Sequence, residues 1–396
     1  MDKKYLIVNR GSASEKYAIY TAEERLAFLH LEKSEGCEDF ISTLFIGETK
    51  EEKCISNKEF KDSLNYALNI FKEKGIIADK KEIQGIGIRI VAPGKHFQDD
   101  KVIDSVYEQE IKKVLRDAPL HLLPTYEMIG ILKKTFKNIP IVGVSDSDFH
   151  DTIPAKAKYY GIPFADTQKY NIQKYGYHGI SVESILNSLK KENTVLPSKI
   201  IICHIGSGVS ITAIKDGKSV ENSMGLTPLE GVMMATRGGD IDPGVIALIS
   251  DSFGFFKGNK LKEYLNKKCG LLGVSGQSSD VRDLLKLEKE GDSKSKLALD
   301  MYAYRIQKYI GSYFVALGGL DAIIFTATVG ERSFIMRERI CQDLNVLGIK
   351  INKEINNQSE GINADISADN SSVQVLVRKT DEMGQIARDT AKVLND

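Results

Sequence analysis

Short apolar runs alternate with amphipathic stretches along the chain, which is typical of an α/β protein. Runs rich in β-branched residues predict strands at Tyr5–Val8, Gly85–Val91, Ile139–Val144, Lys199–His204, Ala322–Thr326 and Val373–Val377. Stretches with helical periodicity predict helices at Tyr107–Leu115, Pro124–Phe136, Val182–Lys190, Leu261–Asn266, Lys294–Leu317 and Glu382–Leu394. In open α/β sheets ligands bind at the carboxyl ends of strands, so we expect the functional residues at these ends.

A faint internal duplication relates the two halves of the chain. Lys4–Ser12 reads KYLIVNRGS and Lys199–Ser207 reads KIIICHIGS, and with no gap Ala18-Ile19 falls on Ala213-Ile214. Each copy predicts an apolar strand, a Gly/Ser turn and a second apolar strand. The pattern indicates a duplicated domain with a cleft between the copies, although hairpins of similar composition also match by chance.

The length of the chain and its net charge limit the number of domains and the kinds of partner that we expect. At 396 residues the chain is long enough for two domains. A formal charge of zero, from 54 basic and 54 acidic residues, gives no support for nucleic acid or a membrane surface as a partner. We expect a small-molecule ligand, and the absence of an apolar run of about 18 residues predicts no membrane span.

The cysteines are few and scattered. They never form a CxxC pair, and no leader-like apolar segment precedes them: Cys37, Cys54, Cys203, Cys269 and Cys341. This spacing argues against a zinc ribbon. We expect reduced thiols in a cytoplasmic protein.

Three glycine turns each follow a predicted strand. They are Gly11–Ser14, which precedes Lys16, then Gly206–Gly208, and Val329–Glu331. Glycine lets backbone N–H groups approach a ligand, serine adds hydroxyl donors, and a lysine reaches phosphate. Any one of them is more often an ordinary tight turn, but the three together favour a nucleotide cleft.

Two other nucleotide loops are excluded by spacing. A Walker loop ending at Gly217-Lys218-Ser219 would need glycine five residues earlier, where Thr212 stands. Gly85-Ile-Gly87 is followed by Arg89 and not by the rest of a dinucleotide fingerprint.

Polar residues stand where strand cores would be apolar. Arg89 interrupts an apolar run, Asp146 follows a strand, and His178 and Arg237 lie in glycine-rich segments. Singly, such residues are more often structural. Together they suit phosphoryl transfer to a carboxylate, because that nucleophile is already ionised and the difficulty is repulsion between two anions.

These residues lie in stretches that resemble the acetate kinase family over essentially the whole chain. The matching stretches are Val8–Ser14, Ala118–His121, Asp146–His150, Lys174–Gly179, Cys203–Gly206, Ser223–Gly231, Thr236–Pro243, Gly270–Asp283 and Glu382 with Ile386–Thr390. The resemblance implies two duplicated ribonuclease-H-like domains of the acetate and sugar kinase, heat-shock chaperone and actin superfamily, with a nucleotide cleft between them. It implies an N-terminal acetokinase lobe, residues 1–149 plus 384–396, and a nucleotide-binding lobe, residues 150–383.

The resemblance also implies an activity: ATP and acetate give ADP and acetyl phosphate, reversibly, in a homodimer that uses magnesium or, as an alternative, manganese. By position, Asn9 and Glu382 would hold the metal. Asp146, His178, Arg237 and Arg89 would be catalytic, and Arg89 would also bind the substrate carboxylate. The acyl pocket would be walled by Val91, Leu120, Tyr177 and Pro228. The nucleotide would contact Lys16, His204, Ile205, Gly206, Ser207, Gly208, Asp280, Val281, Arg282, Thr328, Val329, Gly330, Glu331 and Arg332.

The chain departs from the family pattern at several of these positions. The family usually has a His-Arg-Val-Val-His-Gly-Gly run where this chain has Ile88–Gly94. Ser207 replaces an Asn, Tyr177 replaces a Phe, and Thr328 and Arg332 replace a Gly and an Asn beside the expected nucleoside. Three hypotheses therefore remain: an acetate kinase, a kinase with a longer acid or another phosphoryl donor, and a nucleotide-binding homologue without catalysis.

Overall fold

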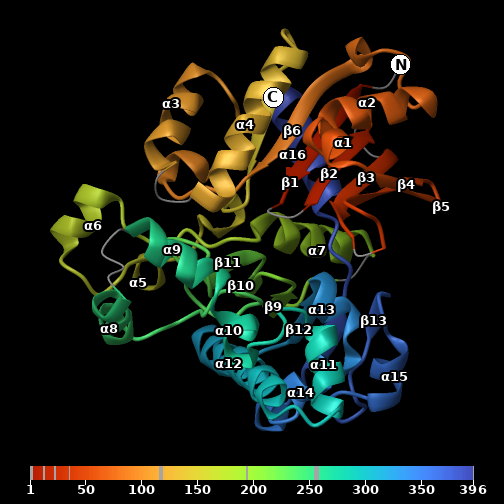
Figure 1. The fold of residues 1–396 in the computed structure, drawn as a ribbon. Coiled ribbons are helices and arrows are strands. Elements are labelled where there is room, and N and C mark those ends of the chain that lie inside the picture. Colours follow the sequence, from red (N-terminus) through yellow and green to blue (C-terminus); the bar gives the residue numbers. More distant parts are fainter. Residues whose placement is uncertain are drawn as a thin grey trace. The chain divides into compact units, whose positions relative to one another are not determined.

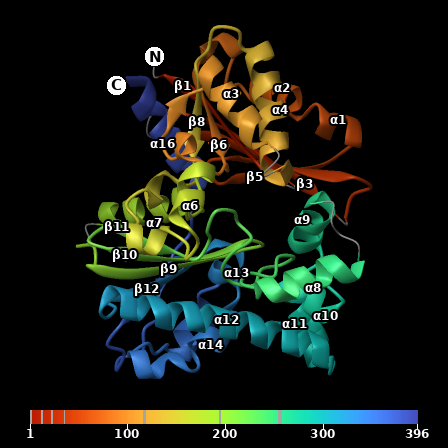
Figure 2. The ribbon, with the colours of Figure 1, turned by 90° about the vertical axis from the view of Figure 1, so that its left-hand side faces the viewer.

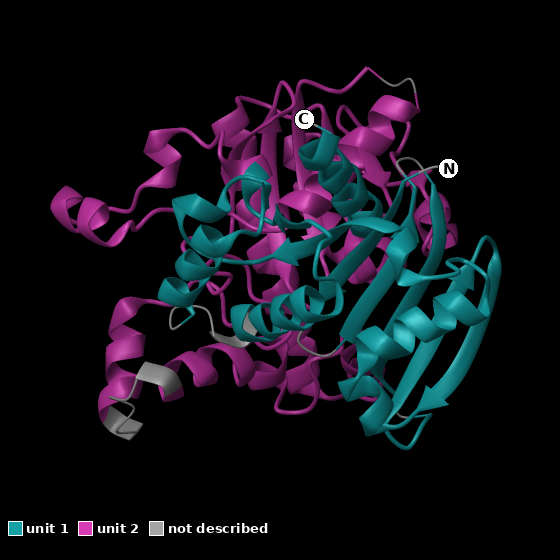
Figure 3. Cartoon of the chain, turned by 90° about the horizontal axis from the view of Figure 1, so that it is seen from above, with its two compact units in different colours: residues 1–148, 381–396 teal, residues 149–380 magenta. Residues whose placement is uncertain are grey.

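The computed structural model describes residues 3–11, 14–21, 24–34, 36–115, 119–192, 195–253 and 258–395. The chain divides into two compact units, unit 1 with residues 1–148 and 381–396, and unit 2 with residues 149–380 (Figure 3). Each unit is built on one sheet covered by helices, which confirms the α/β class. Every strand and helix predicted above is present, with its ends shifted by a few residues.

Unit 1 contains an eight-stranded sheet in the order β5-β4-β3-β2-β1-β6-β8-β7. Its strands are β1 (Lys4–Arg10), β2 (Ser14–Tyr20), β3 (Arg25–Lys33), β4 (Phe40–Ile46), β5 (Thr49–Ile55), β6 (Ile83–Ile90), β7 (Lys101–Val102) and β8 (Ile141–Ser145). Strands β1 to β5 form an antiparallel meander, whereas β1, β6 and β8 run parallel. The parallel strands therefore end at one edge of the sheet.

Helices cover both faces of this sheet. They are α1 (Asn57–Lys61), α2 (Ser63–Glu73), α3 (Ser105–Val114), α4 (Pro119–Thr135) and α16 (Glu382–Asn395). Ile86 and Ile88 of β6 belong to the same buried cluster as Phe71 of α2 and Leu132 of α4. Side chains alternate along a strand, so Gly85 and Gly87 face the other side, where α16 packs on β1 and β6 (Figure 1).

Gly87 lets α16 approach the sheet closely. A Cβ at this position would lie 2.1 Å from the hydroxyl of Thr390 and 3.0 Å from Ile386. A side chain at this position would therefore press on α16. Because α16 begins at Glu382, this close packing brings the start of the helix to the sheet.

Unit 2 contains a six-stranded sheet in the order β11-β10-β9-β12-β14-β13. Its strands are β9 (Lys199–Ile205), β10 (Val209–Lys215), β11 (Lys218–Asn222), β12 (Ala322–Thr326), β13 (Ala364–Asp365) and β14 (Gln374–Val377). Strands β9, β12 and β14 run parallel, and β10 pairs antiparallel with β9. This core repeats the strand directions of β1, β6, β8 and β2.

The helices of unit 2 are more numerous. They are α5 (Ala155–Lys158), α6 (Phe164–Tyr170), α7 (Gly179–Lys191), α8 (Pro243–Phe253), α9 (Gly258–Lys267), α10 (Gly270–Ser275), α11 (Val281–Lys289), α12 (Ser293–Leu317), α13 (Ala327–Arg332), α14 (Phe334–Cys341) and α15 (Lys353–Gln358). Short 3₁₀ helices form at Lys80–Glu82, Lys95–Phe97, Asp148–His150 and Leu344–Leu347. Helix α7 packs on Ile200 and Ile202 of β9, and α12 packs on β9 and β10 from the other face (Figure 2).

The two hairpins that suggested a duplication are β1–β2 and β9–β10, and each has a parallel strand on its other side. Their pairing differs by one residue. Arg10 pairs with Glu15, whereas Ile205 pairs with Val209, so the first turn is one residue longer than the second. The ungapped match of sequence therefore does not extend to the register of the strands.

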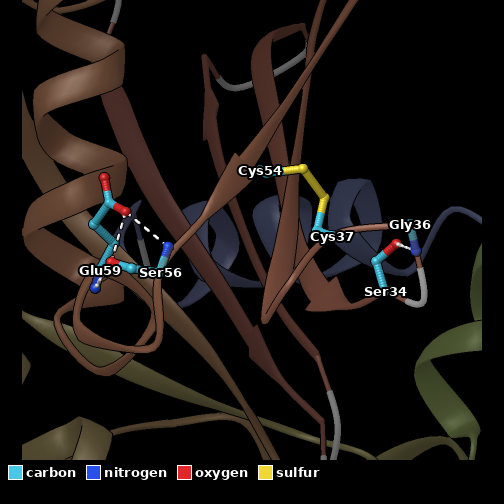
Figure 4. Close-up of a disulfide and its surroundings, with 6 residues drawn as sticks. All are labelled: Ser34, Gly36, Cys37, Cys54, Ser56 and Glu59. Carbon is cyan, nitrogen blue, oxygen red and sulfur yellow. Dashed lines mark hydrogen bonds between the residues drawn. A yellow bond between two sulfur atoms is a disulfide. The ribbon is translucent and has the colours of Figure 1, made fainter.

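The expectation that all cysteines are reduced is wrong for Cys37 and Cys54, which form a disulfide (Figure 4). Cys37 lies between β3 and β4, and Cys54 pairs with Ile41 in the β4–β5 hairpin. Folding thus brings the two Cα atoms to 5.6 Å, which is within disulfide range. The other three cysteines are free thiols.

Within the part of the chain that the structure describes, no helix combines the length and the hydrophobicity needed to cross a bilayer.

Candidate active site

Unit 1 gathers polar side chains at the edge where its parallel strands end. Asn9 lies near the end of β1 and Arg89 near the end of β6, while Asp146 directly follows β8. Glu382 is the first residue of α16. The structure brings these four predicted site residues together, because carboxyl ends of parallel neighbours meet at one edge and α16 is seated against the glycines of β6.

Arg89 is the centre of this cluster. Its Nε and Nη2 atoms each lie 3.0 Å from one oxygen of Asp146, which is a two-pronged ion pair, and its Nη1 atom lies 3.8 Å from Glu382. Burial opposes the charge of Arg89, but the two carboxylates outweigh burial and raise its pKa. Asp146 is only 1% exposed, so its charge is balanced by Arg89 inside the protein.

The other predicted residues of unit 1 are placed less directly. Lys16 pairs with Asn9 across the β1–β2 ladder, so its side chain is on the same face of the sheet. Val91 follows β6 and is half-buried. The side chain of Leu120 lies outside the described residues, as do Ser12 and Ala13 of the first glycine turn.

Unit 2 forms a second cluster around the turn Ile205–Gly208, between β9 and β10. His178 precedes α7 with a left-handed backbone, φ 62°, and its ring stacks on that of His204 with centroids 4.0 Å apart. A Cβ at Gly208 would lie 2.8 Å from Arg237 Nη2 and 3.3 Å from His178 Nε2. Because Gly208 has no side chain, Arg237 and His178 can lie close to the backbone of this turn.

Arg237 has surroundings of a different kind. Its Nη1 atom donates to the carbonyl of Pro228 at 2.9 Å, and burial lowers its pKa to about 10. The guanidinium therefore still carries its charge at neutral pH. The phenol of Tyr177 donates to the carbonyl of Leu226 at 2.8 Å, so both side chains hold the loop that contains Pro228.

The third glycine turn was predicted wrongly as a turn, because Thr328–Arg332 belong to helix α13. Ala327, at its start, has a positive φ of 64°, and its N–H donates to Glu331 at 3.0 Å, which stabilises a sharp entry into the helix. Helix α13 packs on the end of β9, beside the turn at Gly206. Thr328 and Arg332 are exposed and Gly330 is buried.

Arg337, which the sequence did not single out, holds the end of this helix in place. It is fully buried and donates to the carbonyls of Gly330 and Glu331, and to Asn356 and Ser359. These acceptors are all neutral, and burial lowers the pKa of Arg337 to about 10.

Asp280–Arg282 form the beginning of α11, which packs on α12. Asp280 caps the helix by accepting from the Arg282 N–H at 2.7 Å, and it pairs with the exposed Arg282 side chain.

A metal site was expected at Asn9 and Glu382, and these residues lie together, with the Asn9 amide donating to Glu382 at 3.1 Å. Among the described residues no three His, Cys, Asp or Glu side chains form a metal-binding group. Magnesium fits such a sparse donor set, because it usually takes one or two protein oxygens and completes its shell with water and phosphate.

Comparison with known proteins identifies the family of the chain. The sequence profile of the acetokinase family matches residues 4–388. The chain belongs to the acetokinase family. An acetate kinase of Bacteroides thetaiotaomicron is 41% identical over 399 aligned positions, which cover 99% of each chain. The recognition made from sequence motifs is therefore confirmed.

Solved structures agree as well. The chain superposes on the acetate kinase of Porphyromonas gingivalis with a TM-score of 0.84, and on a propionate kinase of Francisella tularensis with a TM-score of 0.88. Both are 34% identical and cover 99% of this chain and 100% of their own. The fold expected for an acetokinase, two related α/β domains, is confirmed.

Sequence reasoning missed a set of hydroxyl groups behind the histidines of this acetokinase. Ser210 Oγ lies 3.0 Å from His178 Nδ1, and Ser181 Oγ lies 2.8 Å from His204 Nδ1. Serine is common in every kind of segment, so no pattern marked these two. A search for hydroxyls one helical turn from His178, and opposite His204 on the neighbouring strand, would have found both.

Proposed function

We propose that this chain transfers a phosphoryl group between ATP and acetate, directly and reversibly, to give ADP and acetyl phosphate. The observation that carries the proposal is the pair of anion-handling clusters, one in each unit, in a chain of the acetokinase family. In the forward step an acetate oxygen forms a bond to the γ-phosphorus while the bond to the ADP oxygen breaks. Both partners are anions, so positive groups must offset their repulsion.

In unit 1 we assign the carboxylate substrate to Arg89. Asp146 occupies its Nε and Nη2 atoms, which fixes the plane of the guanidinium. The substrate carboxylate would approach the remaining edge around Nη1, with Val91 and Leu120 beside its methyl group. Asp146 thus acts by orienting Arg89, since acetate needs no general base.

In unit 2 we assign the phosphates to the turn His204–Gly208. The backbone N–H groups of this turn, the ring of His178 and the guanidinium of Arg237 would contact oxygens of the transferring group. Lys16 of unit 1 would add a mobile positive charge. The nucleoside would contact Asp280–Arg282 and α13, and the acyl group Tyr177 and Pro228. On this proposal residues 1–149 plus 384–396 are the acetokinase lobe and 150–383 the nucleotide lobe.

Magnesium is the proposed divalent ion, with manganese as a substitute, and Asn9 and Glu382 would hold it. When bound, the ion neutralises charge on the nucleotide phosphates. Glu382 is fixed by the packing of α16 and by the Asn9 amide, so these residues supply oxygens at a defined place. Removal of divalent ions with EDTA should abolish transfer, and magnesium should restore it.

A kinase of propionate is the second candidate, because a propionate kinase gives a TM-score of 0.88. One methylene changes discrimination by only about 1–3 kcal/mol, so the fold cannot separate the two acids. A third possibility from the sequence, a homologue that binds nucleotide without catalysis, has less support, because Arg89 and Arg237 would then have no common purpose.

The experiment is a hydroxamate-trap assay with acetate, propionate and butyrate against ATP and other phosphoryl donors. Acetate with ATP should give the highest kcat/KM. A higher kcat/KM by tenfold for another acid or donor would overturn the assignment of substrates. No acyl phosphate with any pair, from a folded protein, would overturn the kinase activity itself.

We extend the proposal to a homodimer in the cytoplasm. Large apolar side chains are exposed on the helices of unit 2, among them Phe164 of α6 and Leu248 of α8. A self-association surface would cover such side chains. Sedimentation of the purified chain should show twice the monomer mass of 44.0 kDa.

A further inference from the structure

The stacked rings of His178 and His204 lie close enough for each to affect the charge of the other. Their centroids are 4.0 Å apart and their planes differ by 21°. Two positive charges at this distance repel, so the pair favours at most one added proton. In each neutral ring one nitrogen carries a proton, and its position determines which N–H can donate a hydrogen bond to an anion.

The hydroxyl of Ser210 determines the proton position in His178. Ser210 is fully buried on β10, and its Oγ atom is 3.0 Å from His178 Nδ1. Among the described residues, the acceptor within hydrogen-bond distance of the Ser210 hydroxyl is His178 Nδ1. A buried hydroxyl proton that is not donated is unfavourable, so Ser210 donates to Nδ1 and the ring carries its own proton on Nε2.

A chain of three hydroxyls determines the proton position in His204. Ser184 donates to the carbonyl of Ser181 at 2.7 Å, so at its 3.3 Å contact with Thr380 its oxygen accepts. Thr380 has then used its proton, and at 2.9 Å it accepts from Ser181. Ser181 has used its proton in turn, and it accepts from His204 Nδ1 at 2.8 Å. In this direction each of the four contacts named above is a hydrogen bond.

We propose that these hydroxyls hold His178 and His204 in opposite tautomers, with the proton on Nε2 in His178 and on Nδ1 in His204. Ser210 is then a positioning residue. It directs the Nε2–H of His178 toward the backbone of Gly208 and toward Arg237, where our proposed function places the transferring phosphoryl group. A neutral ring provides this hydrogen bond without a second positive charge beside His204.

The tautomers can be read without any activity measurement. The chain has six histidines, so long-range ¹H–¹⁵N spectra of protein labelled at histidine can be assigned with single His→Gln variants. At alkaline pH, where imidazoles are neutral, His178 should show a protonated Nε2 and His204 a protonated Nδ1. The same tautomer in both rings, or the reverse assignment, would overturn the proposal.

Variants of Ser210 connect the tautomer to catalysis. Ser210→Ala should shift His178 toward a mixture of tautomers and lower kcat by about tenfold, the scale of one hydrogen bond, with KM for acetate nearly unchanged. Ser210→Thr keeps the hydroxyl and should retain both the spectrum and most of kcat. An unchanged His178 spectrum, or an unchanged kcat, in Ser210→Ala would remove the positioning role.

Ser219→Ala is the matched control. Ser219 is also a fully buried strand serine, and its hydroxyl bonds His150 Nδ1 at 2.9 Å. This control should lose similar stability while kcat stays unchanged. An equal loss of kcat in both variants would mean that Ser210 acts only on stability. If the chain phosphorylates no acid at all, the proposed function fails while the wild-type spectrum still decides the tautomers.

Discussion

The two clusters of charged and polar residues are stabilised in opposite ways. In unit 1 Arg89 is fixed by carboxylates, with both prongs on Asp146 and Glu382 nearby. In unit 2 Arg237 donates to a neutral carbonyl, and serine hydroxyls hold the two histidines. The pKa of Arg89 is therefore raised, whereas burial lowers that of Arg237 to about 10.

This difference suits two different tasks. A cluster that already contains carboxylates balances its own charge and offers a weakly positive site, which suits a small monoanion. A cluster held by neutral groups keeps its positive charge uncompensated, which suits a polyanion such as a triphosphate. The comparison can be tested by removing one group at a time.

The largest effect is expected from the arginines. Arg89→Ala and Arg237→Ala should each lower kcat/KM by about a thousandfold, because each removes charge opposite an anion. Their stabilities should differ. Arg89→Ala removes both hydrogen bonds of the guanidinium to the buried Asp146 and should lower the free energy of unfolding by about 3 kcal/mol. Arg237→Ala removes one hydrogen bond to the carbonyl of Pro228 and should lower it by about 1 kcal/mol.

Urea unfolding and steady-state kinetics measure the two effects separately. The double variant Arg89→Ala/Asp146→Asn is the control, since removing the buried carboxylate charge together with its guanidinium partner should recover part of the stability but not turnover. Equal losses of stability in the two single variants would contradict the comparison.

A smaller effect is expected from acid, through the neutral framework of unit 2. His150 is fully buried, with Ser219 at Nδ1 and the carbonyl of Tyr177 at Nε2, as a structural support would be. Burial lowers its pKa from 6.5 to about 4, partly offset by the bond to that carbonyl. Between these values the unfolded chain binds the proton first, so stability is lost as pH falls from 6.5 toward 4, by about 3 kcal/mol in all.

The measurement is the free energy of unfolding at about pH 7 and about pH 4.5. His150→Gln cannot titrate and should lose less stability over the same step. If wild type and variant lose the same amount, the burial of a neutral imidazole is not what makes unit 2 sensitive to acid.

The smallest effect is expected from Tyr177→Phe. The phenol donates to the carbonyl of Leu226, so its loss should lower the free energy of unfolding by about 1 kcal/mol and leave the ratio of kcat/KM for acetate and propionate within about threefold. Tyr175→Phe is the matched control, because its hydroxyl donates to the carbonyl of Asn171 at 2.9 Å. A tenfold change of the ratio in Tyr177→Phe alone would show that this hydroxyl contacts the substrate.

The core strands can be predicted from the sequence, because buried strands require apolar runs. The polar residues at their ends can be predicted as well, because a polar residue in or directly after such a run is unusual unless it has a structural or functional role. The outer strands, such as β5, cannot be predicted in the same way. The charges of Lys50–Lys53 predict a solvated face, and these side chains are exposed, but the charges do not reveal that the run forms the edge strand β5. Charged side chains on such a strand discourage pairing with another chain.

Residue pairs that meet only through tertiary structure also cannot be predicted from the sequence. Cys37 and Cys54 are 17 residues apart and meet only after β4 and β5 pair, and Ser181 and Ser210 meet their histidines through the packing of α7 on the sheet. Gly330 predicts a turn where the structure has helix α13, because the sequence does not show that Glu331 stabilises the helix by accepting from the Ala327 N–H.

The bond between Cys37 and Cys54 makes the purification buffer an experimental variable. Protein handled in dithiothreitol and protein handled without it would share one sequence but differ in mass by two hydrogen atoms. Melting curves recorded on the two preparations describe different molecules, so intact-mass spectrometry belongs beside every comparison of heat tolerance among variants.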